Sequence, residues 1–158
     1  DEVAFGRIVA AYHDDMCRVC TYVAGDVEIA EDAVQSAWSI AWQKLGSLRQ
    51  PERLRSWLMR VAVNEAKRLL EKRSRRDRLE ASIDASRVPG SVDPATGIDS
   101  LDMLAAIGRL GPDERGLLAM RYVAGFDSVE IAEAIGLSPS GTRTRLERLL
   151  ARLRQERE

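Results

Sequence analysis

The sequence predicts an all-α protein: two small helical domains joined by a flexible acidic linker, with a helix-turn-helix in the second domain. Three observations lead to this prediction. Aromatic residues make up only 5% of the 158 residues, while Ala, Leu, Arg and Glu are abundant. Apolar residues recur at intervals of three and four on both sides of a central segment. That segment, residues 80–100, is rich in Pro, Gly, Ser and Asp and has no sustained period.

The first domain is expected to span residues 1–79 and to contain three helices. The first helix has an apolar stripe from Phe5 to Val23 and ends at Gly25, so that Asp26 can cap the next helix. The second runs from Val27 to about Leu45 and turns an acidic face outward. The third runs from about Glu52 to Arg78, because the proline at position 51 is tolerated only in a first turn.

The second domain, residues 101–158, is expected to begin with a helix up to Leu110 and a second one from about Asp113 to Val123. Asp127 and Glu130 then form a capping box that starts another helix. Gly136 ends this helix, and Ser138 with Pro139 starts the last one. A short capped helix, a tight turn and a longer Arg-rich helix are typical of a helix-turn-helix.

Charge is strongly segregated along the chain, although the net charge is only −1. Residues 1–35 contain eight acidic and two basic residues, whereas residues 53–78 contain ten basic and three acidic residues, a local net charge of +7. Residues 143–157 add six Arg against two Glu. Such a chain can offer one face to phosphate and another to a basic protein partner.

Cys17 and Cys20 are the only cysteines, and their spacing builds no disulfide framework, which is typical of a reducing compartment. No stretch approaches the ~18 apolar residues of a membrane span, and the first ten residues do not form a secretion signal. We therefore expect a cytoplasmic protein without membrane insertion.

A possible metal site is the H-x3-C-x2-C pattern of His13, Cys17 and Cys20, which could place three zinc ligands on one helix. It lacks an evident fourth ligand, and the cysteines fall on or beside the apolar stripe. We predict buried, metal-free cysteines and no cofactor. A zinc- or thiol-based redox sensor stays as an alternative.

Several motifs occur together in one order. Gly25-Asp26 is followed by AEDAVQ at residues 30–35 and by Trp38 and Ala41-Trp42, and WLMRVAVN occupies residues 57–64. Residues 110–138 read LGPDERGLLAMRYVAGFDSVEIAEAIGLS. Their order and spacing resemble the extracytoplasmic-function (ECF) family of bacterial RNA polymerase sigma factors. The chain departs from the family's pattern at Arg68 and Glu71, where the family often has Asp and Arg, and at Gly141-Thr142, where it often has Thr-Val.

The resemblance implies a specificity subunit that binds core RNA polymerase and directs promoter recognition and DNA melting. Asp32 and Gln35 would contact the β′ clamp, where opposite charge speeds association. The third helix and the loop before it would capture an unstacked base of the −10 element and hold the phosphates around it. The residues implied for this −10 contact are Arg53, Arg55, Trp57, Arg60, Asn64, Lys67, Arg68, Lys72 and Arg73, of which Trp57 can equally be a core residue.

The last helix is expected to turn a leucine stripe inward and to read the −35 element from its other side. Its reading residues would be Ser140, Arg143, Thr144, Arg145, Glu147 and Arg148. Arg can pair with guanine, and Glu can accept a hydrogen bond from the cytosine amino group. The alternative is a solvated face of Arg and Glu.

We expect no enzyme activity and no small-molecule substrate, because the chain has no Gly-rich phosphate loop and its single histidine, His13, has no evident nucleophile partner. The expected partners are core RNA polymerase, promoter DNA and an anti-sigma factor. A stand-alone helix-turn-helix regulator that binds palindromic DNA as a dimer is the other alternative. The long basic helix of the first domain argues against it.

Overall fold

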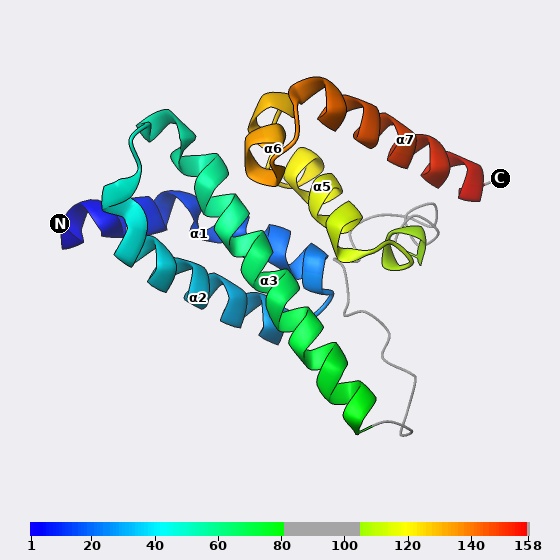
Figure 1. Cartoon of the computed structure of the whole chain (residues 1–158), viewed down its shortest axis with the longest axis horizontal. Helices are drawn as coiled ribbons and strands as arrows, with labels where there is room; N and C mark the ends of the chain where they lie inside the picture. Colours follow the sequence, from blue (N-terminus) through cyan, green and yellow to red (C-terminus); the bar gives the residue numbers. More distant parts are fainter. Residues whose placement is uncertain (81–104, 158) are drawn as a thin grey trace.

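The computed structural model describes residues 1–80 and 105–157, and within these ranges all regular elements are helices (Figure 1). Two 3-10 turns, η1 (Leu45–Ser47) and η2 (Pro51–Arg53), lie between the second and third helices. The helices are α1 (Glu2–Ala24), α2 (Val27–Lys44), α3 (Leu54–Leu79), α5 (Pro112–Tyr122), α6 (Ser128–Ile135) and α7 (Pro139–Arg157). The all-α prediction is confirmed. The predicted linker beyond residue 80 lies outside the described residues, as does the first part of the helix predicted before Leu110.

The boundary between α1 and α2 forms as the sequence predicts. Gly25 ends α1 in the left-handed region, with φ 67°, and its N–H donates to the Thr21 carbonyl at 2.8 Å. A glycine suits this position because it has no Cβ to strain the left-handed backbone. The Asp26 carboxylate then accepts hydrogen bonds from the backbone N–H groups of Glu28 and Ile29. These bonds satisfy amide groups that have no partner within the first turn of a helix.

Helices α1, α2 and α3 bury their apolar faces against one another. The inner face of α2 consists largely of alanine, and its small side chains let the neighbouring helices come close. Leu58, Met59 and Met16 fill the space between them, each at most 2% exposed. The buried alanines of α2 are Ala30, Ala33, Ala37 and Ala41. No helix in the described ranges has the length and apolar content needed to cross a membrane.

One helix boundary differs from the sequence expectation. Helix α3 begins at Leu54 rather than Glu52, because Pro51–Arg53 forms a 3-10 turn, an arrangement that is frequent at helix N-termini. Within α5, Leu117, Leu118 and Met120 are buried, and Tyr122 in the last turn is 62% exposed.

The capping box at α6 is complete. The Glu130 N–H donates to the Asp127 carboxylate at 2.8 Å, and the Asp127 N–H donates to the Glu130 carboxylate at 3.2 Å. Gly136 ends α6 with φ 77°, and the Ser138 hydroxyl accepts a hydrogen bond from the Gly141 N–H at the start of α7. The helix-turn-helix geometry therefore follows from the predicted caps.

Helix α5 packs on α1, and α6 packs on α3, so these two helices lie against the part of the chain before residue 80 (Figure 1). Gly116 lies in the contact between α5 and α1: a Cβ there would be 3.4 Å from Val23 and 3.6 Å from Val63. Beside it, the Arg115 guanidinium donates two hydrogen bonds to the Val23 carbonyl, at 2.7 and 3.1 Å. This places a cation at the C-terminal end of α1, whose own last turn has no basic residue.

Asp26 both caps α2 and pairs with Arg73 of α3, so Asp26→Ala is expected to lower the free energy of unfolding by ~1–2 kcal/mol in urea titrations near neutral pH. The Arg73 guanidinium lowers the pKa of Asp26 in the folded protein. A folded pKa below the unfolded value gives stability that is present above about pH 4 and is lost as the pH falls through the folded pKa. The difference in the free energy of unfolding between the wild type and the variant should therefore become smaller in acid.

The matched control is Asp14→Ala, which removes an exposed carboxylate within α1 that caps no helix. Its effect should stay within ~0.5 kcal/mol at either pH. An equal loss for the two variants would contradict the role assigned to Asp26.

Candidate nucleic-acid interface

The outer face of α2 is acidic and accessible. Asp32 and Gln35, the predicted polymerase contacts, are both exposed and neighbour each other at helical spacing. Neither side chain makes an ion pair or a hydrogen bond to another residue in the described ranges. Glu28 and Glu31 are exposed on the same helix. This surface therefore offers carboxylates to a basic partner.

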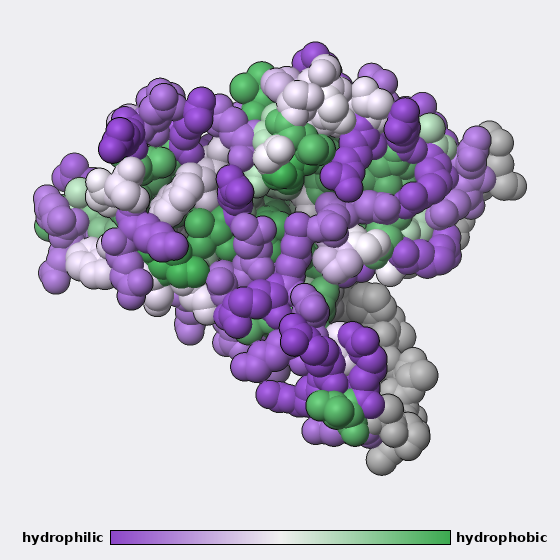
Figure 2. All heavy atoms as spheres, viewed as in Figure 1, coloured by the Kyte–Doolittle hydropathy of each residue, from purple (hydrophilic) through white to green (hydrophobic). Residues whose placement is uncertain are grey.

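The C-terminal half of α3 extends beyond the helices packed around it, and its surface is largely hydrophilic (Figures 1 and 2). Arg60, Asn64 and Lys72 are exposed along this helix. Near its end lies an open groove between side chains of α3, four of which are basic. The lining residues are Arg68, Lys72, Arg75, Arg76 and the 89% exposed Leu79. Arg75 and Arg76 are additional candidates for phosphate contact, and the sequence signal for them was the same basic run.

Several predicted −10 cations already have carboxylate partners. Arg68 pairs with Glu65 at 2.8 Å within α3. The other pairs join α3 or η2 to a different helix: Arg53–Glu133 at 3.6 Å, Arg55–Glu130 at 2.9 Å, Lys67–Asp113 and Arg73–Asp26. Lys67 lowers the pKa of the Asp113 carboxyl, so this carboxylate is ionised at neutral pH. Trp57 is half-buried against the core, which gives it a packing role.

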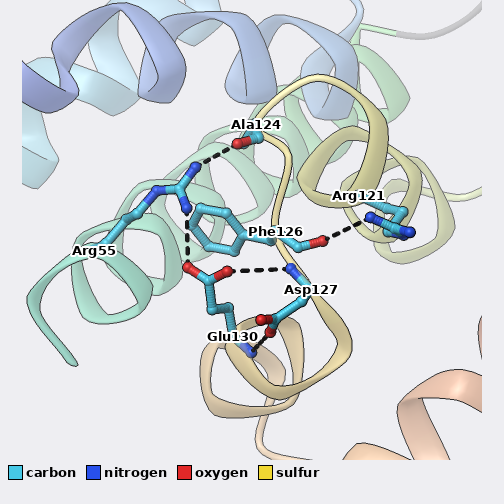
Figure 3. A network of polar contacts seen from close by, with 6 residues as sticks. All are labelled: Arg55, Arg121, Ala124, Phe126, Asp127 and Glu130. Carbon is cyan, nitrogen blue, oxygen red and sulfur yellow. Dashed lines mark hydrogen bonds and ion pairs between the residues drawn. The ribbon is translucent and has the colours of Figure 1, made fainter. Parts of the chain in front are cut away.

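Arg55 is the most constrained of these cations (Figure 3). Its guanidinium pairs with Glu130, donates to the Ala124 carbonyl and lies over the Phe126 ring, 4.2 Å from the ring centroid. Glu130 is also the acid of the α6 capping box, so Arg55 is tied to the start of the helix-turn-helix. Sequence reasoning could not find this contact, because the partners lie 69 to 75 residues away.

Helix α7 has the two faces that the sequence predicts. Leu146, Leu149 and Leu153 are buried, and Leu150 is half-buried. The predicted reading residues are all exposed on the other side: Ser140, Arg143, Thr144, Arg145, Glu147 and Arg148. None of the four charged residues among them makes an ion pair with a residue that the structure describes. A helix that follows a capped helix and a tight turn can present this face to a major groove.

The comparisons with known proteins match both parts of the chain. Residues 8–76 match the Sigma-70 region 2 family, and residues 100–153 match the Sigma-70, region 4 family. The chain is 30% identical over 162 residues to the ECF RNA polymerase sigma factor SigL of Mycobacterium tuberculosis, covering 96% of this chain and 89% of that one. This chain belongs to the ECF sigma factors.

Two further relatives show the range of similarity. The probable RNA polymerase sigma factor RfaY of Xanthomonas campestris pv. campestris is 32% identical over 97% of this chain. The chain spans only 40% of the length of RfaY. Among solved structures, the sigma factor RpoE of Bartonella quintana, in complex with the anti-sigma factor NepR, superimposes with a TM-score of 0.78. That match covers 97% of this chain and 96% of the other at 22% identity, so it shows the shared fold.

Thr142 is a residue of the sigma factor's last helix that sequence reasoning did not place in the core. It is fully buried, and its hydroxyl oxygen has no hydrogen-bond partner among the described residues. The preceding residue, Gly141, lies close to Ser138: a Cβ at position 141 would be 2.9 Å from the Ser138 hydroxyl oxygen. A side chain at position 141 would therefore crowd the Ser138 hydroxyl, which accepts the hydrogen bond from the Gly141 N–H.

The three residues of the H-x3-C-x2-C pattern already make other contacts in the structure. Cys20 is buried and donates toward the Ala62 carbonyl, 3.5 Å away, whereas the Cys17 sulfur lies 3.4 Å from Nε2 of His13. The Trp38 indole, which can only donate, lies 3.0 Å from Nδ1 of His13. In the neutral ring the proton is therefore on Nε2, which leaves no lone pair there for zinc. No set of three metal-binding side chains occurs in the described part of the chain.

The folded sigma factor is expected to react slowly with a thiol reagent at pH 7, because only the thiolate reacts quickly. Burial raises the pKa of Cys17 and raises that of Cys20 to about 12. The reaction rate should rise with pH and approach that of a free thiol after unfolding in guanidinium. Single Cys17→Ala and Cys20→Ala variants assign the two rates, and a rapid reaction of Cys17 at pH 7 would favour the redox alternative.

Proposed function

We propose that this chain acts as an ECF sigma factor: it binds core RNA polymerase, recognises promoter DNA and supports strand opening, without catalysis or a cofactor of its own. The observation that supports this most strongly is the presence of two separate surfaces suited to bind DNA in one chain. One is the basic helix α3, and the other is the exposed face of α7. A promoter with a −10 and a −35 element requires two such surfaces.

The proposed domains are residues 1–79 for polymerase and −10 binding and residues 101–158 for −35 binding. In the first, Asp32 and Gln35 are the proposed contacts to the β′ clamp. Their exposure supports this role, because neither has a partner in the described structure that polymerase would have to displace. Charges at the rim of an interface mainly increase the association rate.

The proposed −10 contact combines base capture with phosphate binding. Asn64 and Arg60 lie on the exposed side of α3 and offer polar groups to an unstacked base, while Lys72 and Arg68 lie farther along the same helix. Cations beside a polar pocket hold the phosphates on either side of a captured base. Arg53, Arg55, Lys67 and Arg73 can join this contact only when they leave their present partners.

We further propose an anti-sigma factor as a regulatory partner, as the solved structure of RpoE with NepR suggests for a protein of this fold. A protein that acts on promoters would work in the cytoplasm. The stand-alone regulator is the second candidate, since α6 and α7 alone could bind duplex DNA. It leaves the exposed basic groove of α3 without a role.

Transcription with purified core polymerase tests the proposal. On a template library with randomised promoter positions, transcripts should start downstream of shared −10 and −35 sequences only when this chain is added. Asp32→Arg is expected to reduce the product at least tenfold by weakening core binding, which a competition assay against labelled sigma factor measures directly. The control is Asp14→Arg, a charge reversal on the exposed surface of α1. No chain-dependent product with any template would refute the function.

Arg148→Ala is expected to cost ~1–3 kcal/mol at the preferred −35 sequence and to relax the preference at one base, as loss of a bidentate guanine contact does. Arg154→Ala, on a later turn of the same helix, should weaken binding evenly across sequences and reduce its salt dependence. Binding titrations over a set of −35 variants at several salt concentrations distinguish the two. Equal, uniform losses would mean that α7 contributes only electrostatic attraction.

A further inference from the structure

The outward face of α7 has a centre that the burial of its other side defines. Successive residues of an α-helix are turned by about 100° from each other around the axis. The buried residues of α7 are Thr142, Leu146, Leu149 and Leu153. Thr144 and Ala151, both exposed, lie on the side opposite to them. Of the two, Thr144 is nearer the N-terminal end, which a recognition helix places against the bases, so it lies at the middle of the proposed reading surface.

The Thr144 hydroxyl is already engaged within the helix. Its Oγ1 donates a hydrogen bond to the Ser140 carbonyl, 3.0 Å away. Threonine carries a hydroxyl and a methyl group on Cβ, and a bond to the carbonyl four residues earlier turns the hydroxyl toward the backbone. Since the hydroxyl has only one proton, that proton is used, and the methyl group is the part of the side chain left for a base edge.

We propose that Thr144 is a specificity-determining residue of α7, which selects thymine through contact of its methyl group with the C5 methyl of that base. This inference rests on the −35 role proposed above for α7, and it adds which base the centre of the reading surface prefers. In the major groove thymine is the base that presents a methyl group, and apolar contact with it distinguishes T·A from other base pairs. Such a contact needs no proton from the hydroxyl.

The spacing between Thr144 and Arg148 limits which thymine can be read. The two residues are four positions apart, so they are separated by about 6 Å along the helix axis. Base pairs of B-DNA follow one another about every 3.4 Å. The selected thymine should therefore lie within about two base pairs of the base that Arg148 reads, on either strand.

The rival role for Thr144 is a hydrogen bond to a base through its hydroxyl oxygen, which can still accept after donating its proton. That oxygen would accept from the amino group of adenine or cytosine. Two substitutions separate the roles. Thr144→Val keeps a methyl group and removes the hydroxyl, whereas Thr144→Ser keeps the hydroxyl and removes the methyl. Because Thr144 is exposed, both substitutions leave the buried side of α7 unchanged.

Replacement of thymine by deoxyuridine tests the proposal, because uracil differs from thymine only by the missing C5 methyl. Core polymerase loaded with this chain is titrated with a fluorescent promoter duplex that carries the preferred −35 sequence, and each thymine of that element is replaced in turn. Wild type should lose about fourfold in affinity at one position, as expected for one methyl-sized apolar contact. Thr144→Val should respond in the same way. Thr144→Ser should bind the thymine duplex about fourfold more weakly and be insensitive to deoxyuridine.

Three results would overturn the proposal. In the first, no thymine within two base pairs of the base that responds to Arg148→Ala is sensitive to deoxyuridine in the wild type. In the second, Thr144→Ser keeps the full deoxyuridine response. In the third, Thr144→Val loses the base preference while Thr144→Ser keeps it, which would assign the reading to the hydroxyl.

The sequence preference of the wild type separates this inference from the function on which it rests. If the wild-type complex prefers one −35 sequence but gives any of those three results, the role of Thr144 is refuted and the −35 role of α7 stands. If the wild-type complex binds all −35 sequences equally, the −35 role of α7 fails, and the inference about Thr144 fails with it.

Discussion

The arrangement of the chain depends on the close approach of α5 to the C-terminal end of α1. A helix ends with carbonyl groups that lack partners within the helix, and Arg115 satisfies the one at Val23 with two hydrogen bonds. Its neighbour Gly116 has no side chain and so allows α5 to lie against Val23 and Val63. With α5 fixed there, α6 reaches α3, and the ion pairs of Arg55 and Lys67 become possible.

This dependence links the electrostatics of the chain to its packing. The segregation of charge along the sequence serves two kinds of contact, one inside the molecule and one with outside partners. The exposed carboxylates of α2 have no described intramolecular partner, whereas Asp113 of α5 and Glu130 of α6 are paired with cations of α3. A partner that offers stronger charge complementarity than these half-exposed pairs can therefore change the arrangement of the helices.

Much of the fold could be predicted because its determinants are local. Gly25, Asp26 and the capping box of Asp127 with Glu130 set helix ends through neighbours in sequence, and the leucine stripe of α7 follows from helical periodicity. The contacts of Arg55 with Ala124 and of Arg115 with Val23 could not be predicted, because the partners lie 69 and 92 residues away and no period connects them.

The candidate site shows the same division between local and distant information. The exposure of the α7 reading residues follows from the helical period, so it could be predicted, but which α3 cations are occupied depends on tertiary packing. The family resemblance indicated which residues of α3 to consider. It carried no information on the carboxylates that this particular chain places opposite them.

Thr142 has a consequence for how this protein could be adapted. A buried hydroxyl without a partner costs about 1–3 kcal/mol relative to an apolar group of the same shape, and the related pattern often has valine at this position. The cost falls on the inner side of α7, away from the side chains that face outward. A designer could therefore recover that stability through Thr142→Val and use it to tolerate destabilising changes among the outward residues. The helix could then be given new DNA preferences with less risk of unfolding.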